Sequence, residues 1–389
     1  MKVAILTQPL HTNYGGILQA YALQTFLQNH GHEVVVVNRE YDFNLSPRLF
    51  LLRIGSVLKT CMRVFLLGNN EYYIMNPFSP FYHTKWSGYD ILPFVKQYIN
   101  HSKDIRSSRS LNKYLKNNKF DCYIVGSDQV WRPSYSPCIS DFFLKGLPID
   151  DKSLKIAYAA SFGTDKWEFT DEETRECSLL AKKFDAVSVR EYSGIKLCQK
   201  HLGVEALHLL DPTMLLELDE YIKLFERANV SKSAGNLFCY VLDKNDGINC
   251  VVQSLVKDGY KPNFVSLSVE YTDNKTRPYQ KSVEEWLRGV YDAELVVTDS
   301  FHACVFAILF NKPFIAWNNV SRGNARFDSL LSQFDLCHRL IDSYSCFEEK
   351  KKELVQPLNK GEISTLLESY RGKSYEFFNQ IGLKVSFSK

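Results

Sequence analysis

No stretch of this chain comes near the ~18 uninterrupted apolar residues that a transmembrane helix requires. The N-terminus, MKVAILTQPL, holds one lysine and a short apolar run, which is typical of a first strand and not of a secretory signal. Net charge is also small, because 47 Lys and Arg against 44 Asp and Glu give +3 at pH 7, too little for a general nucleic-acid-binding protein. These features predict a cytosolic protein that binds no nucleic acid and holds a few basic residues for a small anion.

Motifs of several common enzyme classes are missing as well. The sequence contains no H-E-x-x-H, G-x-x-x-x-G-K-[ST], G-x-S-x-G or G-x-G-x-x-G motif, and no Cys/His set with metal-ligand spacing. Its ten cysteines form no C-x-x-C pair and are spread too thinly for a disulfide scaffold. We therefore expect free thiols, no metal and no cofactor, and we do not expect metal-dependent hydrolysis, P-loop phosphoryl transfer or serine-hydrolase chemistry.

The pattern that is present alternates short apolar runs with helical periodicity, which indicates α/β structure. At about 150 residues per domain, 389 residues favour two domains. Strands are expected at 2–7, 33–38, 121–126, 155–160, 185–190 and 206–210, then at 237–242, 264–268, 294–298 and 313–317, with helices at 15–30, 282–291 and 302–310 among others. Both strand series are complete on their own sides of Asp211-Pro212, so we place a first domain at 1–211, a second at 212–345 and a helical tail at 346–389.

Residues 48–67 (RLFLLRIGSVLKTCMRVFLL) stand apart from this pattern. Apolar residues recur there at i, i+3/i+4 spacing on one helical face, namely Phe50, Ile54, Val57, Leu58, Cys61 and Phe65. Basic charge on the other faces comes from Arg48, Arg53, Lys59 and Arg63. Two interpretations stay open: a helix packed on the core of the first domain, or a helix that lies on an anionic membrane surface.

Four polar segments follow expected strands, at the sheet edge where ligands of open α/β sheets bind. They are residues 11–16, 126–131, 297–302 and 321–326, and Arg190 ends a further strand. Two glycines in the first segment let the backbone approach a ligand at a helix N-terminus, and an Asp such as Asp128 can accept a proton from a hydroxyl group. Paired arginines can grip a phosphate or carboxylate through forked hydrogen bonds. An ordinary turn, a helix cap or an exposed basic loop explains each segment as well.

Taken together and in this order, the segments resemble the polysaccharide pyruvyl transferase family. The matching pieces are NYGGILQAYALQ (13–24), VGSDQVWRP (125–133), ASFG (160–163), SVRE (188–191), DPTMLL (211–216), TDSFHACVFAILFNKPF (298–314) and the segment with Arg322 and Arg326. The resemblance implies two Rossmann-like domains that face each other across a cleft, as in GT-B glycosyltransferases. It also implies phosphoenolpyruvate as donor, a sugar or lipid-linked oligosaccharide as acceptor, and a pyruvate ketal as product.

For this chemistry the resemblance makes His302 the general acid or phosphate partner and Asp128 the base. The expected donor-binding residues are Arg190, Arg322, Arg326, Ser300, Asn13, Gly15 and Gly16. The expected acceptor-binding residues are Tyr14, Ser127, Gln129 and Trp131. Family members often carry Arg-Leu-His where this chain has Ser300-Phe301-His302, so the histidine carries over and the arginine does not. Either Arg322 or Arg326 supplies that charge, or the donor is handled differently.

Two other functions remain as alternatives. The same architecture serves glycosyltransferases that use a nucleotide sugar, and a non-catalytic partner in polysaccharide assembly would share the sequence pattern. A lipid-linked acceptor would bring the enzyme into peripheral contact with the inner face of the cell membrane.

Overall fold

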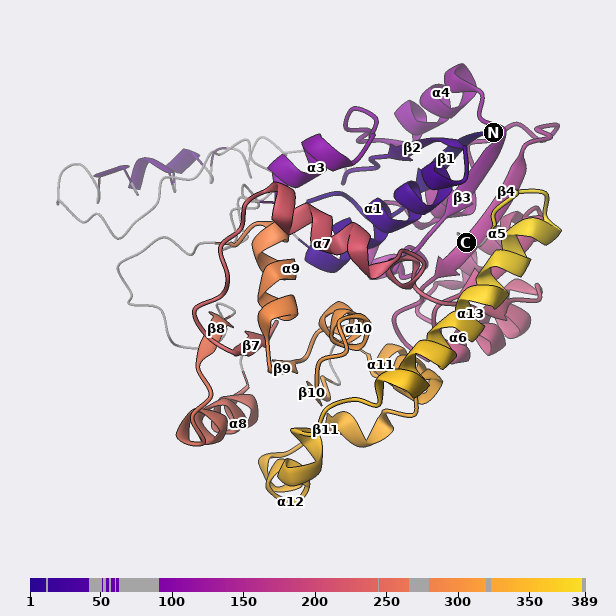
Figure 1. Cartoon of the computed structure of the whole chain (residues 1–389). Coiled ribbons are helices and arrows are strands. Elements are labelled where there is room, and N and C mark those ends of the chain that lie inside the picture. Colours follow the sequence, from indigo (N-terminus) through magenta and orange to yellow (C-terminus); the bar gives the residue numbers. More distant parts are fainter. Residues whose placement is uncertain are drawn as a thin grey trace.

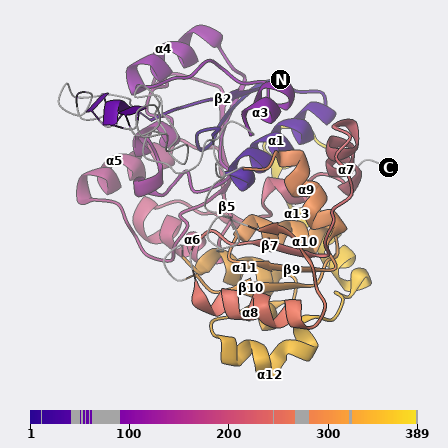
Figure 2. The same cartoon turned by 90° about the vertical axis from the view of Figure 1, so that its left-hand side faces the viewer.

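The computed structural model describes residues 1–11, 13–41, 51, 54–55, 57–59, 61–62, 91–243, 245–265, 280–319 and 323–386. Within these ranges the chain forms two parallel β-sheets with helices packed around them (Figure 1). Figure 2 shows the strands of the second sheet, in orange, below the indigo and purple elements of the first half of the chain.

The first sheet has the order β2-β1-β3-β4-β5-β6, and all its pairings are parallel. Its strands are β1 (Lys2–Leu6), β2 (Glu33–Val37), β3 (Cys122–Val125), β4 (Leu154–Ala160), β5 (Ala186–Val189) and β6 (Leu207–His208). The central strands are apolar along their whole length because helices cover both faces of a parallel sheet. The chain turns back between β1 and β3, so a crevice for ligands is expected at their carboxyl ends.

The second sheet has the order β11-β10-β9-β7-β8 and is parallel as well. Its strands are β7 (Leu237–Tyr240), β8 (Pro262–Val265), β9 (Leu295–Thr298), β10 (Phe314–Trp317) and β11 (Leu340–Ile341). Here the chain reverses direction between β7 and β9, which places a second crevice beyond the ends of those two strands.

The helices connect the strands in the usual crossover manner. They are α1 (Tyr14–Asn29), α3 (Leu92–Tyr98), α4 (Ser108–Asn118), α5 (Asp171–Ala181), α6 (Tyr192–Leu197), α7 (Leu218–Arg227), α8 (Asp246–Lys257), α9 (Val283–Asp292), α10 (Phe301–Leu309), α11 (Ala325–Gln333), α12 (Tyr344–Leu354) and α13 (Lys360–Gln380). Capping boxes fix two of their starts: Thr170 with Glu173 at α5, and Ser282 with Glu285 at α9.

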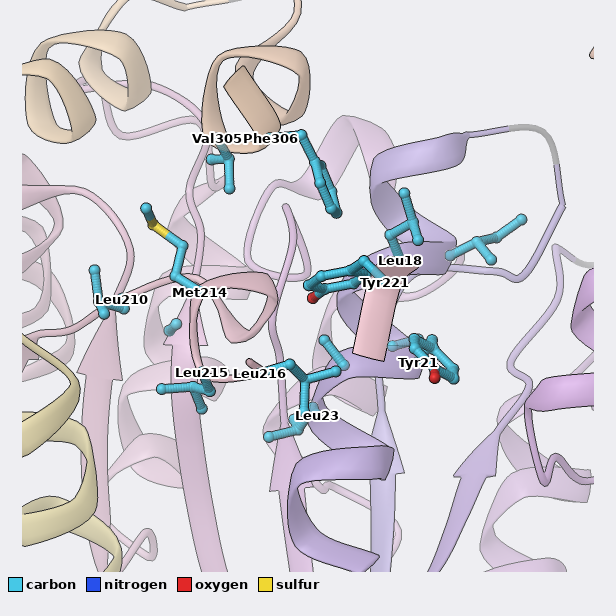
Figure 3. Close-up of a cluster of buried hydrophobic side chains, with 14 of the residues drawn as sticks. Leu18, Tyr21, Leu23, Leu210, Met214, Leu215, Leu216, Tyr221, Val305 and Phe306 are labelled. Atoms are coloured by element: carbon cyan, nitrogen blue, oxygen red, sulfur yellow. The ribbon is translucent and has the colours of Figure 1, made fainter. Parts of the chain in front are cut away.

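One hydrophobic core joins the two halves. It combines Leu18 and Tyr21 of α1 with Tyr221 of α7 and with Val305 and Phe306 of α10 (Figure 3). The ring of Tyr221 meets that of Phe306 edge-on at 4.9 Å between centroids. Apolar packing of this kind fixes the N-termini of α1 and α10 relative to each other.

The last helix, α13, drawn in yellow in Figure 1, packs against the first half of the molecule. On α13, the ring of Phe378 stacks on Tyr158 of β4 at 4.6 Å, and Ser374 lies 3.1 Å from the hydroxyl of Tyr158. Arg371 donates to the backbone carbonyl of Met214 at 2.7 Å and pairs with Glu217. The C-terminal helix therefore contacts β4 and the residues that join the two halves of the chain. The domain limits at residues 211 and 345 stay a prediction.

The strands expected from the sequence are present, each within a few residues of its expected bounds. The short strand β11 had no signal because it has two residues, and it is defined by its pairing with β10. Most of the segment 48–67 lies outside the described residues. Those described within it are helical and none of them is buried. In the described part of the chain, every helix is too short or too polar to traverse a membrane.

Candidate active site

The carboxyl ends of the two sheets meet where α1 and α10 begin. Asn13 caps α1 by accepting a hydrogen bond from the backbone N–H of Gly15 at 3.1 Å. Ser300 caps α10 in the same way, with its hydroxyl 3.5 Å from the N–H of Ala303. A β-carbon on Gly15 would lie 1.9 Å from Nδ1 of His302, so only glycine allows the two helix ends to approach this closely.

A buried cluster of charges surrounds Arg190, which follows β5. Its guanidinium donates to Oδ2 of Asp211 at 2.9 Å and to Oδ1 of Asp128 at 3.2 Å. Burial by itself lowers the pKa of Arg190, but Asp128, Asp211 and Glu191 outweigh that effect and raise the pKa above its ordinary value. Arg190 is therefore a permanently charged and geometrically fixed centre.

His302 reaches the same cluster from the second half of the chain. Its Nε2 lies 3.5 Å from Oδ2 of Asp211, and its ring is buried. Burial by itself raises the pKa of Asp211, but His302 and then Arg190 overcome burial and hold that pKa below its ordinary range. Asp211 also accepts from the N–H and hydroxyl of Thr213, at 3.0 and 2.7 Å. An ionised Asp211 can thus orient the imidazole of His302.

Two arginines lie close to the ring of Phe301. The guanidinium carbon of Arg190 lies 4.7 Å from the ring centroid, and that of Arg326 lies 5.9 Å from it. Burial and, next, the charge of Arg190 lower the pKa of Arg326 to about 10. Two buried cations this close to one another favour an anion between or beside them.

Glu191 supplies a further buried carboxylate, next to Arg190. Ser161 donates to its Oε1, and Oε1 lies 3.8 Å from Nε of Arg190. Burial raises the pKa of Glu191, although Arg190 and Ser161 act against it. Sequence reasoning left Glu191 and Asp211 without a role. The signal that would have found Asp211 is the one used for Asp128, a carboxylate just after a strand.

Asp128 lies where it was expected, beyond the end of β3. It is buried and has a left-handed backbone, with φ at 61°. Its Oδ1 contacts Arg190, and its Oδ2 would be 3.2 Å from a β-carbon at Gly16. The structure therefore brings together Asp128, Arg190, His302 and the start of α1, four parts of the expected site that are far apart in the sequence.

Two expected acceptor residues belong to the core instead, which corrects their assignment. Tyr14 is 1% exposed, stacks on Trp286 with 5.5 Å between ring centroids, and donates its hydroxyl to the carbonyl of Lys281. It fixes α1 against the second half of the chain. Trp131 is fully buried, stacks on Phe143 at 4.9 Å and donates to a backbone carbonyl. Neither ring has a face that a sugar could contact.

The other expected residues divide in a similar way. Ser127 is buried and donates its hydroxyl to the carbonyl of Ala159 at 2.8 Å, so it is part of the scaffold and not of an acceptor site. Gln129 is mostly buried, and its Oε1 accepts from Arg132 at 3.2 Å. Ser300 serves as the cap of α10 and adds no charge. Arg322 lies outside the described residues.

Asp299 has a structural role beside the site. Its carboxylate accepts from the backbone N–H groups of Leu242 at 2.6 Å and Asp243 at 3.2 Å, which ties the end of β9 to the end of β7. Among the described residues, no group of three or more His, Cys, Asp or Glu side chains could hold a metal ion.

Known proteins share the family profile and the fold of this chain. The profile of the family described as polysaccharide pyruvyl transferase matches residues 13–319, and no curated protein sequence matches the chain. The fold is similar to UDP-GlcNAc 2-epimerase from Neisseria meningitidis bound to UDP-GlcNAc, at TM-score 0.50 and 11% identity over 98% of this chain and 100% of that one. It is also similar to a putative UDP-N-acetylglucosamine 2-epimerase from Listeria monocytogenes, at TM-score 0.51 and 9% identity over 99% of this chain and 97% of that one. The GT-B-like fold expected from the sequence is thereby confirmed.

Proposed function

Since the chain belongs to the polysaccharide pyruvyl transferase family, we propose that it moves the enolpyruvyl group of phosphoenolpyruvate onto a sugar of a polysaccharide precursor and releases phosphate. The observation that carries this proposal is the pair of buried guanidinium groups, Arg190 and Arg326, whose central carbons lie 4.7 and 5.9 Å from the Phe301 ring centroid, next to His302. Phosphoenolpyruvate carries a carboxylate and a phosphate on three carbons, and such a compact anion suits two arginines set close together.

The reaction has two bond-forming steps. One sugar hydroxyl oxygen bonds to C2 of the donor while C3 gains a proton and becomes a methyl group. A second hydroxyl oxygen then bonds to C2, the C2–O bond to phosphate breaks, and phosphate leaves with the electron pair. One hydroxyl proton leaves with each attack, so one proton ends on C3 and the other on phosphate or solvent.

His302 is the group we assign to proton delivery. Its contact with the buried Asp211 holds the ring in place, and a histidine at this position can protonate C3 or donate a proton to the departing phosphate. Asp128 is the candidate base for the attacking hydroxyl, and Arg190 holds one of its oxygens in place. Family members often carry an arginine at the position of Ser300, and we assign the charge of that arginine to Arg326 in this chain. The N-terminus of α1, with Asn13, Gly15 and Gly16, adds the positive end of a helix dipole.

Mass spectrometry of candidate acceptors tests the proposal. Neutral and lipid-linked oligosaccharides are incubated with the protein and phosphoenolpyruvate, and in parallel with nucleotide sugars. The proposal predicts an acceptor mass increased by one pyruvate ketal, only in the presence of phosphoenolpyruvate. A mass increased by a hexosyl group with a nucleotide sugar would make the protein a glycosyltransferase instead. No change with any donor would favour a non-catalytic partner in polysaccharide assembly.

We extend the proposal to the membrane surface through residues 48–67. Leu51, Leu58 and Met62 are 68%, 60% and 59% exposed. Exposed apolar side chains in a segment whose sequence is rich in arginine and lysine fit an interfacial helix better than a helix packed on a core. Such a helix would hold the enzyme close to an acceptor carried on a lipid.

A further inference from the structure

A cavity of about 900 Å³ lies between the two halves of the molecule. The residues that line it are different from those of the buried charge cluster around Arg190. One wall comes from the loop 164–168 and from α6, and the other comes from Gly323 and α11. The backbone N–H of Tyr192 on α6 donates to the hydroxyl of Ser329 on α11 at 2.9 Å, which joins the two walls. The volume is near the upper end of the ~300–1,000 Å³ usual for small-molecule sites. A three-carbon donor would leave most of it empty.

Both walls include sequence neighbours of residues in the charge cluster. Tyr192 lines the cavity two residues after Arg190. On α11, Ala325, Asp328 and Ser332 share one face and line the cavity, because residues three and four apart lie above one another on a helix. Arg326 sits on the neighbouring face and points to Phe301. Residues of the cavity wall are therefore sequence neighbours of both arginines.

The lining is polar and its charges balance. The lining contains three basic and three acidic residues, and among them Arg132 forms an ion pair with Glu168 at 3.0 Å. The remaining polar groups are mostly hydroxyls, among them Thr164, Ser193 and Ser332. Balanced charge gives no preference for an anion, whereas alternating donors and acceptors suit a ligand rich in hydroxyl groups.

Tyr192 adds an apolar surface to this polar lining. Tyr192 lines the cavity and is 62% exposed, so its ring is accessible to a ligand. A phenol ring of this kind can pack against the C–H face of a sugar while polar groups around it bind the hydroxyls. The described cavity thus combines a stacking platform with a hydrogen-bonding wall.

From these observations we infer that the cavity between α6 and α11 binds the acceptor as a neutral oligosaccharide, with Tyr192 as the stacking platform. That a neutral glycan binds in the cavity follows from the cavity lining alone. That this glycan is the acceptor of the reaction rests on the proposed function. It replaces the acceptor site expected around Tyr14 and Trp131, whose rings are buried.

Saturation-transfer NMR tests the inference without turnover. The probes are neutral di- to tetrasaccharides of glucose, galactose, mannose and N-acetylhexosamines, with no phosphoenolpyruvate present. We expect Tyr192→Ala and Ser332→Trp, which remove the platform and fill the cavity, to weaken binding about tenfold or more. Tyr192→Phe should bind within about twofold of the parent, because it keeps the ring. Tyr344→Ala changes a tyrosine on α12, 38% exposed and outside the cavity, and is the matched control.

The outcomes separate the two claims. Loss of glycan binding in Tyr192→Ala and Ser332→Trp supports the inference even if the parent transfers no pyruvyl group, a result that would overturn the proposed function alone. Equal binding by the parent and both variants overturns the inference, and so does the absence of binding by the parent to every probe. In an active enzyme, the same variants should raise the KM for the sugar and leave the KM for phosphoenolpyruvate unchanged.

Discussion

Gly15, in the first half of the chain, lies against the imidazole of His302, in the second half, so closely that a β-carbon on Gly15 would stand 1.9 Å from Nδ1. Real β-carbons do not come this near to another heavy atom, so the position admits glycine alone. The contact joins the starts of α1 and α10 and places the proposed proton donor opposite a helix N-terminus. The site therefore depends on both halves of the molecule at once.

Gly15→Ala should displace His302 and lower turnover by about 10²-fold, the effect of a shift near 1 Å in a catalytic group. The measurement is steady-state kinetics, with circular dichroism to show that the variant is folded. Gly361→Ala is the matched control, since a β-carbon there meets nothing closer than 3.6 Å. A folded Gly15→Ala variant with the activity of the parent would contradict the close contact.

His302→Ala should lower turnover by roughly 10²–10⁴-fold and leave the fold intact, as expected for loss of a general acid. His338→Ala removes a histidine that is 36% exposed and far from the cluster, and it should keep full activity. If His302→Ala yields no folded protein, the histidine is structural. If it is folded and active, the assignment of proton delivery is wrong.

Arg326→Lys should raise the KM for phosphoenolpyruvate about tenfold or more, because lysine keeps the charge but not the forked geometry. The acceptor KM should change little. Arg288→Lys, on α9, alters an arginine that pairs with Asp292 at 2.7 Å and serves as control. A variant with unchanged donor KM and a collapsed acceptor affinity would place Arg326 on the acceptor side of the site.

Acid should reveal the buried network around Asp211. Its folded-state pKa lies below the ordinary value of 3.8, so it contributes stability above about pH 4 that is lost as the pH falls through the depressed pKa. Asp211→Asn should cost up to about 3–5 kcal/mol at pH 7, because it removes the buried carboxylate that both Arg190 and His302 contact. Urea titrations should show the difference between parent and variant shrinking toward pH 3. A constant difference would mean that the pKa of Asp211 is the same in the folded and the unfolded protein, and would contradict the depressed pKa.

The sequence predicts the scaffold well because local patterns encode it. Apolar runs of four to six residues, each followed by a polar turn, place β1, β3, β5 and β9 and so place Asp128 and His302 at strand ends. The errors have one cause in common. Whether Tyr14 or Trp131 faces a ligand depends on partners far along the chain, such as Trp286, and no local pattern contains that information. The role of Asp211 likewise emerges only when Arg190 and His302 converge on it.

Membrane attachment is tested by flotation with anionic vesicles at low ionic strength. The parent should float, and Arg53, Lys59 and Arg63 changed together to Gln should abolish binding, since each basic residue contributes about 1 kcal/mol near an anionic surface. Added salt should weaken the binding of the parent.

The control for flotation removes the same charge elsewhere. Lys182, Lys183 and Lys200 are exposed after α5 and α6, and their triple change to Gln should leave flotation unchanged. If the parent stays unbound at low ionic strength, residues 48–67 do not attach the protein to membranes.

The most direct test of the account is the release of phosphate from phosphoenolpyruvate, measured together with ketal formation on the sugar. The account predicts release that requires the acceptor, one phosphate for each ketal formed, and loss of both in Gly15→Ala and His302→Ala. Phosphate release at the same rate with and without the sugar would contradict the account. Ketal formation that persists without a histidine at position 302 would contradict it as well.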